Sequence, residues 1–477
     1  MGVSVIEAAQ IKPSERQLSW QRLEFYGFIH FTVNTFTDRE WGMGDESPDI
    51  FNPTELNAAQ WVEVCRSAGM QGVILTCKHH DGFCLWPSEY TEHSVKNSPW
   101  KNGQGDLVRE VADACHAAGL KFGIYVSPWD RHEPSYGDSE LYNSYFVNQL
   151  RELLTGYGEL FCVWFDGACG EGPNGKRQVY DWDAYYEVIR NHQPNAVISV
   201  CGPDVRWCGN EAGNTRSQEW SSVPATMRDN EKIQESSQHV DDGEFAKRIG
   251  SQEEDLGSRA ILAEAEQMIW YPAEVNTSIR PGWFYHASED EFVKSLDELT
   301  DLYERTVGGN STFLLNLPPD TRGLIHENDA RRMRELGERI EAAYKHNLAD
   351  GVQALATHEK NASHRADRVT DGQSSTYWCP PEGQEEAQLT IDLGSEQAFD
   401  RIVLQEYVSE GQRIEAFQLE WQDGDVWRTL YEGNIVGYKR ICRFEEVTAQ
   451  RIRLVILQSR WCPTISQFEV YATGLGL

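Results

Sequence analysis

Apolar runs and amphipathic stretches alternate along residues 25–346 of this 477-residue chain. The runs predict buried strands, at residues 26–31, 72–76, 121–126, 161–165 and 196–200. The stretches between them predict helices, at residues 57–68, 106–118, 140–154 and 184–191. Strands that alternate with helices at this spacing are typical of parallel βαβ units. Five such strands in a row favour a (β/α)8-like barrel over an open sheet.

The alternation stops over residues 203–265, which are polar and carry the acidic cluster Asp241-Asp242-Gly243-Glu244. A stretch this long without clear elements is usually a functional loop or lid. The alternation then returns, with strands expected at 267–271 and 311–315 and helices at 291–306 and 329–344. We therefore expect a barrel domain over residues 1–346.

Short alternating runs replace the helical pattern after about residue 350. They predict strands at residues 388–393, 401–406, 416–421, 426–431, 440–444, 451–457 and 467–471, with no helix between them. This pattern indicates an all-β sandwich over residues 350–477. Two domains also suit the length, because single cores stop growing at about 250–300 residues.

Composition narrows the function classes. The net charge of −32 and the lack of a basic patch argue against nucleic acid as a partner. No apolar run approaches the ~20 residues of a membrane span, and residues 1–12 lack the features of a signal peptide, so we expect a cytoplasmic protein. The 11 cysteines form no CxxC pair, which is typical of free thiols in a reducing compartment. The sequence does not indicate an oligomeric state.

Polar side chains follow the predicted strands of the barrel where each strand ends. They are His30 at the end of the first, His79 and His80 after the second, Tyr125 at the end of the third and Asp166 after the fourth. Glu40 and Trp41 lie in the loop after the first strand. Because the carboxyl ends of barrel strands carry the chemistry, we expect these residues to meet at one face. The alternative for Asp166 is a helix cap or a structural ion pair.

A glycosidase needs two carboxyl groups, one to attack or to activate water and one to donate a proton. If Asp166 is the first, the second belongs on a nearby loop. Glu211, between glycines in Gly209-Asn210-Glu211-Ala212-Gly213, directly follows the fifth strand and is favoured. Glu219 and Glu274 are the rivals, and each of these acids has a solvated surface role as its alternative.

A metal site is not expected. His79, His80 and Asp81 could supply ligands, but adjacent residues on a strand point to opposite faces, so the two histidines should not chelate together. We therefore expect both histidines to be neutral imidazoles that form hydrogen bonds with hydroxyl groups. The 16 tryptophans are compatible with stacking on sugars.

Several segments together match a known family pattern. They are His30-Phe31, Glu40-Trp41, Lys78-His79-His80-Asp81-Gly82-Phe83, Trp164-Phe165-Asp166-Gly167 and Arg280-Pro281-Gly282-Trp283-Phe284-Tyr285-His286. Over about residues 20–345 the chain resembles the α-L-fucosidases of glycoside hydrolase family 29. The last segment and the loop of Glu211 resemble the subfamily that cleaves α-1,3- and α-1,4-linked fucose from branched, Lewis-type glycans.

The resemblance implies a retaining exo-α-L-fucosidase that needs no cofactor and acts on fucosylated oligosaccharides and glycoconjugates. Asp166 would be its nucleophile and Glu211 its acid/base. The residues expected to bind fucose are His30, Glu40, Trp41, His79, His80, Tyr125 and Trp283. Contacts beyond the fucose ring are expected from segment 203–265, with Trp207, Trp220 and the acidic stretch near Asp241 as candidates.

The second domain resembles discoidin-type domains, which include family 32 carbohydrate-binding modules. The matching stretches are Asn361-Ala362-Ser363, Val369-Thr370-Asp371-Gly372, Thr376-Tyr377-Trp378 and Phe468-Glu469-Val470-Tyr471. Such domains often hold a structural Ca²⁺, for which Asp371 and Glu469 are candidates. Either sugar binding or bracing of the barrel would suit this domain.

Three other functions remain alternatives from the sequence. One is a non-catalytic carbohydrate-binding protein on a degenerate barrel, against which the retained Asp166 and Glu211 argue. Another is a metal-dependent sugar isomerase on the same barrel type. The last is an α-L-fucosidase of broad specificity.

Overall fold

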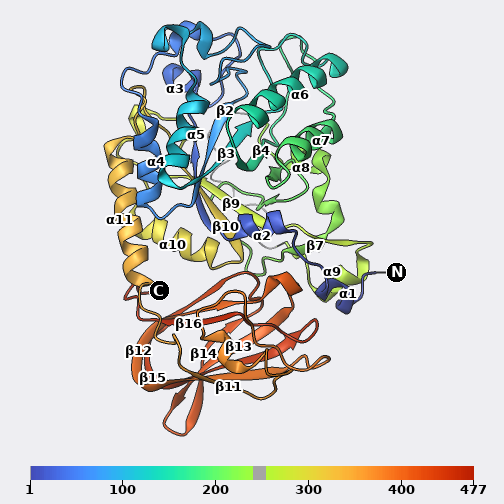
Figure 1. Cartoon of the computed structure of the whole chain (residues 1–477), viewed down its shortest axis with the longest axis vertical. Helices are drawn as coiled ribbons and strands as arrows, with labels where there is room; N and C mark the ends of the chain where they lie inside the picture. The colour runs from blue at the N-terminus through green and yellow to red at the C-terminus, as the bar shows by residue number, and fades with distance from the viewer. Residues whose placement is uncertain (1, 240–253) are drawn as a thin grey trace.

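Eight parallel strands form a nearly closed barrel in the first part of the molecule (Figure 1). The computed structural model describes residues 2–239 and 254–477. The strand order is β5-β4-β3-β2-β1-β10-β9-β6. A parallel bridge between Ser199 and Val205 brings the two ends of this order together. The strands are β1 (Phe25–Ile29), β2 (Gly72–Lys78), β3 (Lys121–Val126), β4 (Leu160–Phe165), β5 (Val197–Val200), β6 (Arg206–Trp207), β9 (Ala273–Ser278) and β10 (Ser311–Asn316). The predicted barrel is confirmed.

Helices cover the outside of the barrel. The longer ones are α4 (Ala58–Ser67), α5 (Leu107–Ala118), α6 (Ser139–Gly156), α7 (Trp182–His192), α10 (Leu296–Val307) and α11 (Glu327–Ala343). The chain also has the shorter helices α1 (Val5–Ala9), α2 (Glu15–Gln21), α3 (Val33–Thr37), α8 (Asn230–Ser236) and α9 (Arg259–Glu264), of which α1 and α9 contribute to a small cluster of their own. Asp106 begins α5 by accepting from the amide of Arg109, and Gly119 ends it with φ of 74°. Within the described ranges, no helix combines the length and apolar character needed to cross a membrane.

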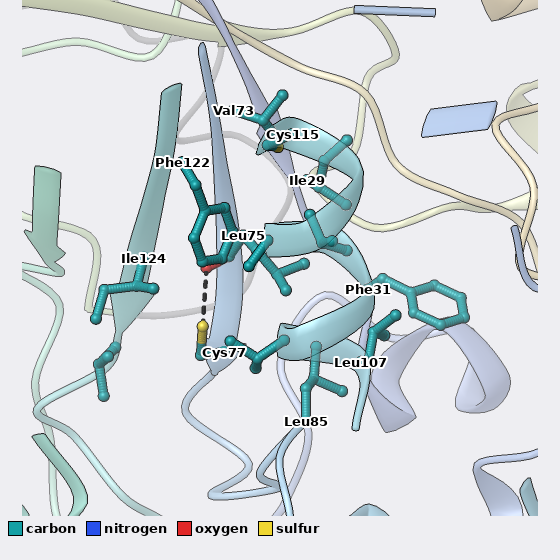
Figure 2. Packing of buried hydrophobic residues seen from close by; sticks show 14 of the residues in the cluster. Ile29, Phe31, Val73, Leu75, Cys77, Leu85, Leu107, Cys115, Phe122 and Ile124 are labelled. Atoms are coloured by element: carbon teal, nitrogen blue, oxygen red, sulfur yellow. Dashed lines mark hydrogen bonds between the residues drawn. The ribbon is translucent and has the colours of Figure 1, made fainter. Parts of the chain in front are cut away.

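The barrel core lies between the strands and this helical layer. Figure 2 shows α5 beside β2 and β3, and Leu107 and Cys115 of the helix belong to the same buried cluster as Leu75 and Phe122 of the strands. These four side chains are at most 1% exposed. Burial of this kind contributes about 25 cal/mol per Å² of apolar surface, so the strand–helix interface stabilises the barrel.

Two barrel strands differ from the prediction. Residues 268–270 form β8 (Met268–Trp270), which pairs antiparallel with β7 (Ser222–Pro224) outside the barrel. The barrel uses β6 and β9 instead. β6 has two residues, and β9 turns Glu274 and Asn276 inward, so neither gives an apolar run. Segment 203–265 therefore holds β6, β7, α8 and α9 rather than one long loop, while Asp241 and its acidic neighbours lie outside the described residues.

The second domain is an antiparallel β domain with its own core (orange to red in Figure 1). Its strands are β11 (Gln353–Ala356), β12 (Ala387–Gln405), β13 (Ile414–Asp423), β14 (Val426–Gly433), β15 (Arg440–Ser459) and β16 (Gln467–Tyr471). β12 and β15 each merge two predicted strands, and β11 was not predicted. The pairing of β12 shifts after Asp392, next to Gly394 with φ of 78°, which interrupts the sequence pattern without ending the strand. The helical turns of residues 350–477, all described, are short 3-10 turns.

Candidate active site

A pocket opens at the carboxyl ends of the barrel strands. All the residues that we expected, from the sequence, to take part in catalysis or fucose binding line this pocket. They are His30, Glu40, Trp41, His79, His80, Tyr125, Asp166, Glu211 and Trp283. Phe28, Trp164, Trp207 and Asn276 also line the pocket. The pocket is thus built from strands and loops that are far apart in the sequence.

Asp166 lies directly after β4 and points into this pocket. Its Oδ2 accepts a hydrogen bond from the Tyr125 hydroxyl at 2.7 Å, and its Oδ1 accepts from the amide of Ala168 at 2.8 Å. Nε2 of His80 lies 3.8 Å from Oδ2. Asp166 does not cap a helix, because α7 begins later and is capped by Asp181. The carboxylate is therefore held in one orientation with one face toward the pocket.

Glu211 is a half-buried acid on the loop after β6. Its Oε2 accepts from the indole Nε1 of Trp283 at 3.0 Å. The pKa of Glu211 is raised to about 8. Loss of solvent is the main cause and the charges of Asp166 and Glu40 contribute, while the hydrogen bond from Trp283 opposes the rise. At neutral pH Glu211 is therefore mostly protonated. A proton donor and an oriented carboxylate face the same pocket.

The rival acids have other surroundings. Glu219 is fully buried in an ion pair with Arg206, 2.5 Å away, and with Arg216, 3.4 Å away. Glu274 is enclosed inside the barrel, where it accepts hydrogen bonds from Nε1 of Trp164, at 2.7 Å, and from the hydroxyl of Tyr26. Neither carboxylate lines the pocket.

The hydrogen-bond partners of two histidines fix their tautomers. Ser127 donates to the carbonyl of Trp129 at 2.7 Å, so its oxygen accepts the Nδ1 proton of His80, also at 2.7 Å. The amide nitrogen of Asn316 donates to Ser278 and to the carbonyl of Trp283, so Oδ1 of Asn316 accepts from Nδ1 of His30 at 2.8 Å. Both histidines therefore have an unprotonated Nε2.

These imidazoles are neutral near pH 7. Burial lowers the pKa of His30 to about 3 and that of His80 to about 4, and it lowers the pKa of His79 well below its ordinary value. A neutral Nε2 accepts a hydrogen bond, and the hydroxyl groups of a sugar can donate one. The geometry therefore agrees with the expectation that these histidines bond to hydroxyls.

The expectation that His79 and His80 point to opposite faces is wrong. β2 ends at Lys78, so strand alternation no longer applies, and the two rings lie 4.2 Å apart in the same pocket. With Asp166 they offer ligand atoms within 4.8 Å of one another, the one such group of three found in the described chain. That no metal takes part remains a prediction, one that no longer rests on opposed faces.

Glu40 organises the loop that carries Trp283. Its two carboxylate oxygens accept from the backbone amides of Trp283 and Phe284, at 2.8 and 2.9 Å. His286 bonds to the same carboxylate at 2.8 Å, and this bond raises the pKa of His286 to about 9. Glu40 thus contacts the pocket and also holds Trp283 in place, a second role that the sequence did not indicate. Trp41 lies edge-on to His80, with ring centroids 5.4 Å apart.

Other predicted residues divide between pocket and interface. Trp207 lines the pocket and donates to Asn276 at 3.0 Å. Trp220 is 2% exposed and lies under the guanidinium of Arg460 from the second domain, so it is no candidate for sugar contact. Asn316, which orients His30, was missed although it ends β10 and the strand-end rule would have found it.

The two calcium candidates have these contacts. Asp371 accepts from the Thr376 hydroxyl at 2.8 Å and from the amide of Gln373 at 2.9 Å, which makes it the cap of its own turn. Burial raises the pKa of Glu469, and the charge of Lys439 opposes this rise. Neither belongs to a group of three metal-ligating side chains in the part of the chain that is described.

Comparison with known proteins assigns both halves of the chain. Residues 13–343 match the family model described as α-L-fucosidase, and residues 353–468 match the F5/8 type C domain, the discoidin-like type. α-L-Fucosidase 1 of Arabidopsis thaliana is 42% identical over 466 residues, which cover 96% of this chain and 87% of that protein.

Solved structures agree with this assignment. A putative α-L-fucosidase from Bacteroides ovatus is 45% identical with a TM-score of 0.85, covering 98% of this chain and 75% of the other. A glycoside hydrolase family 29 fucosidase from Ruminococcus gnavus, solved in complex with fucose, is 32% identical with a TM-score of 0.83, covering 97% of this chain and 95% of the other. On the fold, the pocket and these matches, the chain belongs to the α-L-fucosidases of glycoside hydrolase family 29 and carries a C-terminal discoidin-like domain.

Proposed function

We propose that this α-L-fucosidase is a retaining exo-enzyme in which Asp166 is the nucleophile and Glu211 the acid/base. The observation that carries the proposal is the contrast between the two acids. Glu211 is held mostly protonated by burial and by the nearby charge of Asp166, whereas Asp166 is fixed by two donors and faces the pocket. Two carboxyl groups whose environments differ in this way suit the roles of acid and nucleophile.

The reaction takes two steps. In the first, an Asp166 oxygen attacks the anomeric carbon of fucose while Glu211 gives its proton to the departing glycosidic oxygen. In the second, Glu211 takes a proton from water, whose oxygen attacks the same carbon and releases Asp166. Fucose leaves with its original configuration, and Glu211 is protonated again. The Tyr125 hydroxyl, 2.7 Å from Asp166, stabilises the carboxylate as it departs.

Azide rescue tests both assignments. Asp166→Ala should lose most of kcat, and azide should restore part of the rate by attacking from the vacated side, giving a fucosyl azide of inverted configuration. In Glu211→Ala, azide should instead intercept the covalent intermediate and give the azide of retained configuration. Near-normal activity of Asp166→Ala without azide would rule out the nucleophile assignment.

We further propose specificity for fucose linked α-1,3 or α-1,4 to N-acetylglucosamine, as in Lewis-type glycans. The subfamily resemblance of residues 280–286 supports it. So does the rim of the pocket, where Trp207, Ser237 and Gln238 come from the segment after β5 and can contact a neighbouring sugar. Contacts to a remote sugar can lower the barrier at the reacting bond.

A substrate panel tests this specificity. kcat/KM should be higher on a Lewis trisaccharide than on 2′-fucosyllactose or on an aryl fucoside. Equal or faster turnover of 2′-fucosyllactose would favour broad specificity instead. Absence of turnover on all three substrates would favour a carbohydrate-binding role, and loss of activity with a chelator would favour metal-dependent chemistry.

A further inference from the structure

Glu211 lies on a segment, residues 208–221, that has no regular secondary structure. Such a segment is held only by its individual contacts. Close to Glu211, Asn210 closes a turn, because its Oδ1 accepts from the amides of Ala212 and Asn214 at 3.1 and 3.2 Å. On the barrel side, the amide of Cys208 donates to the carbonyl of Glu274 at 3.0 Å. These contacts set the local shape of the turn and its beginning.

The two ends of the segment are tied together by buried charges. Arg216 donates to the carbonyl of Cys208 at 3.0 Å and pairs with Glu219 at 3.4 Å. Glu219 also pairs with Arg206 of β6, 2.5 Å away. These bonds connect the far end of the segment with its beginning at Cys208, two residues before Asn210 and its turn.

The second domain contacts that far end, which the barrel also holds, since the amide of Tyr271 donates to the carbonyl of Ser221 at 2.7 Å. Arg440, the first residue of β15, donates to the carbonyl of Ser217 at 3.2 Å. Gln412 accepts from the amide of Ser221 at 2.7 Å. The guanidinium of Arg460 lies 3.7 Å from the ring centre of Trp220.

Asn310 adds a link from the barrel. Its amide nitrogen donates to the carbonyl of Glu219 at 2.6 Å, while its Oδ1 accepts from the amide of Tyr438 at 2.7 Å. The residue has φ of 61°, which an Asn tolerates better than most residues. The same side chain therefore contacts the segment of Glu211 and the second domain.

We propose that the discoidin-like domain is part of the catalytic machinery, because Arg440 and Gln412 position the acid/base segment 208–221. The proposal rests on the role of Glu211 proposed above. A catalytic group must be held within about 0.5 Å of its productive position, and rigid neighbours supply that precision. The barrel alone leaves the carbonyl of Ser217 and the amide of Ser221 without these partners.

The experiment compares Arg440→Ala and Gln412→Ala with Arg443→Ala in the full chain. Arg443 is on the same strand and in the same interface, but it pairs with Asp301 and Glu304 of α10 and not with the segment. kcat/KM is measured on a Lewis trisaccharide, whose leaving group needs the acid, and on 2-chloro-4-nitrophenyl fucoside, whose leaving group does not. Thermal unfolding of each variant reports stability separately.

Arg440→Ala and Gln412→Ala should each lose at least about ten-fold on the trisaccharide and less than about three-fold on the aryl fucoside. Arg443→Ala should affect both substrates equally, and Arg440→Lys should recover part of the loss. Equal losses on both substrates in the two test variants, or none, would overturn the proposal. Glu211→Gln is the separate control. If this variant does not lose more activity on the trisaccharide than on the aryl fucoside, the proposed role of Glu211 is wrong, independently of the second domain. If Arg440→Ala does not fold, Gln412→Ala decides.

Discussion

Trp283 donates a hydrogen bond from its indole Nε1 to Oε2 of Glu211 at 3.0 Å, while its own backbone amide donates to Glu40. One residue thus connects Glu211, the proposed acid/base, with Glu40 in the loop after β1. The bond stabilises the carboxylate form of Glu211, so it opposes the rise in pKa that burial and the charges of Asp166 and Glu40 produce.

Trp283→Phe should therefore raise the pKa of Glu211 further. The phenyl ring keeps the apolar contact but cannot donate. The basic limb of the pH profile of kcat/KM reports the acid of the free enzyme, so it should move to higher pH by up to about one unit. Trp41→Phe is the control, because its ring lines the pocket beside His80 without a bond to Glu211. A basic limb that moves to lower pH in Trp283→Phe would mean that the indole acts by excluding water.

Ser127 fixes the tautomer of His80, and Ser127→Ala should release it. The Nδ1 proton then has no partner, so Nε2 carries the proton part of the time and no longer accepts from a sugar hydroxyl. Loss of one such hydrogen bond should lower kcat/KM by about ten-fold. Nitrogen NMR of the imidazole should show the mixed tautomer directly. Ser199→Ala, a buried serine that bonds to Cys162, should change neither measurement. An unchanged tautomer in Ser127→Ala would contradict this account.

The sequence predicts most of the site because the strand-end rule depends only on topology. His30, His79 and Asp166 follow largely apolar strands and Tyr125 lies at the end of another, so each strand and its end are visible in the sequence. β9 escapes the rule because it carries Glu274 and Asn276 on its inward face. Which of Trp207 and Trp220 reaches the pocket depends on the interface with the second domain, and no local pattern encodes that interface.

Glu274 should make stability depend on pH. Burial raises its pKa to about 7 from an ordinary 4.5. The folded protein therefore keeps a proton that the unfolded chain loses. The contribution of Glu274 to the free energy of unfolding is fully present below about pH 4.5 and is lost as the pH rises through 7. The difference between 4.5 and about 7 corresponds to roughly 3 kcal/mol.

Glu274→Gln should remove this dependence, because the amide does not titrate. Urea unfolding at pH 5 and at pH 8 measures it: the wild type should lose up to roughly 3 kcal/mol more than the variant between the two pH values. If the free energy of unfolding changed equally with pH in the wild type and the variant, the carboxyl of Glu274 would have the same pKa in the folded and unfolded states, and the prediction would be wrong. Because Glu274 does not line the pocket, the variant should also lack the leaving-group dependence expected of Glu211→Gln.

Glu219 should be important for stability, since its buried carboxylate pairs with two buried arginines. Glu219→Ala leaves Arg206 and Arg216, each at most 5% exposed, without this carboxylate. Breaking a buried pair by removing one partner costs about 3–5 kcal/mol, because the remaining charge stays buried. Glu254→Ala is the matched control. Glu254 pairs with the same Arg216 at 2.8 Å, but its side chain is 50% exposed, so its removal should cost less than about 1 kcal/mol. Equal losses in urea unfolding for the two variants would show that water reaches the arginines and that the pair is not sealed.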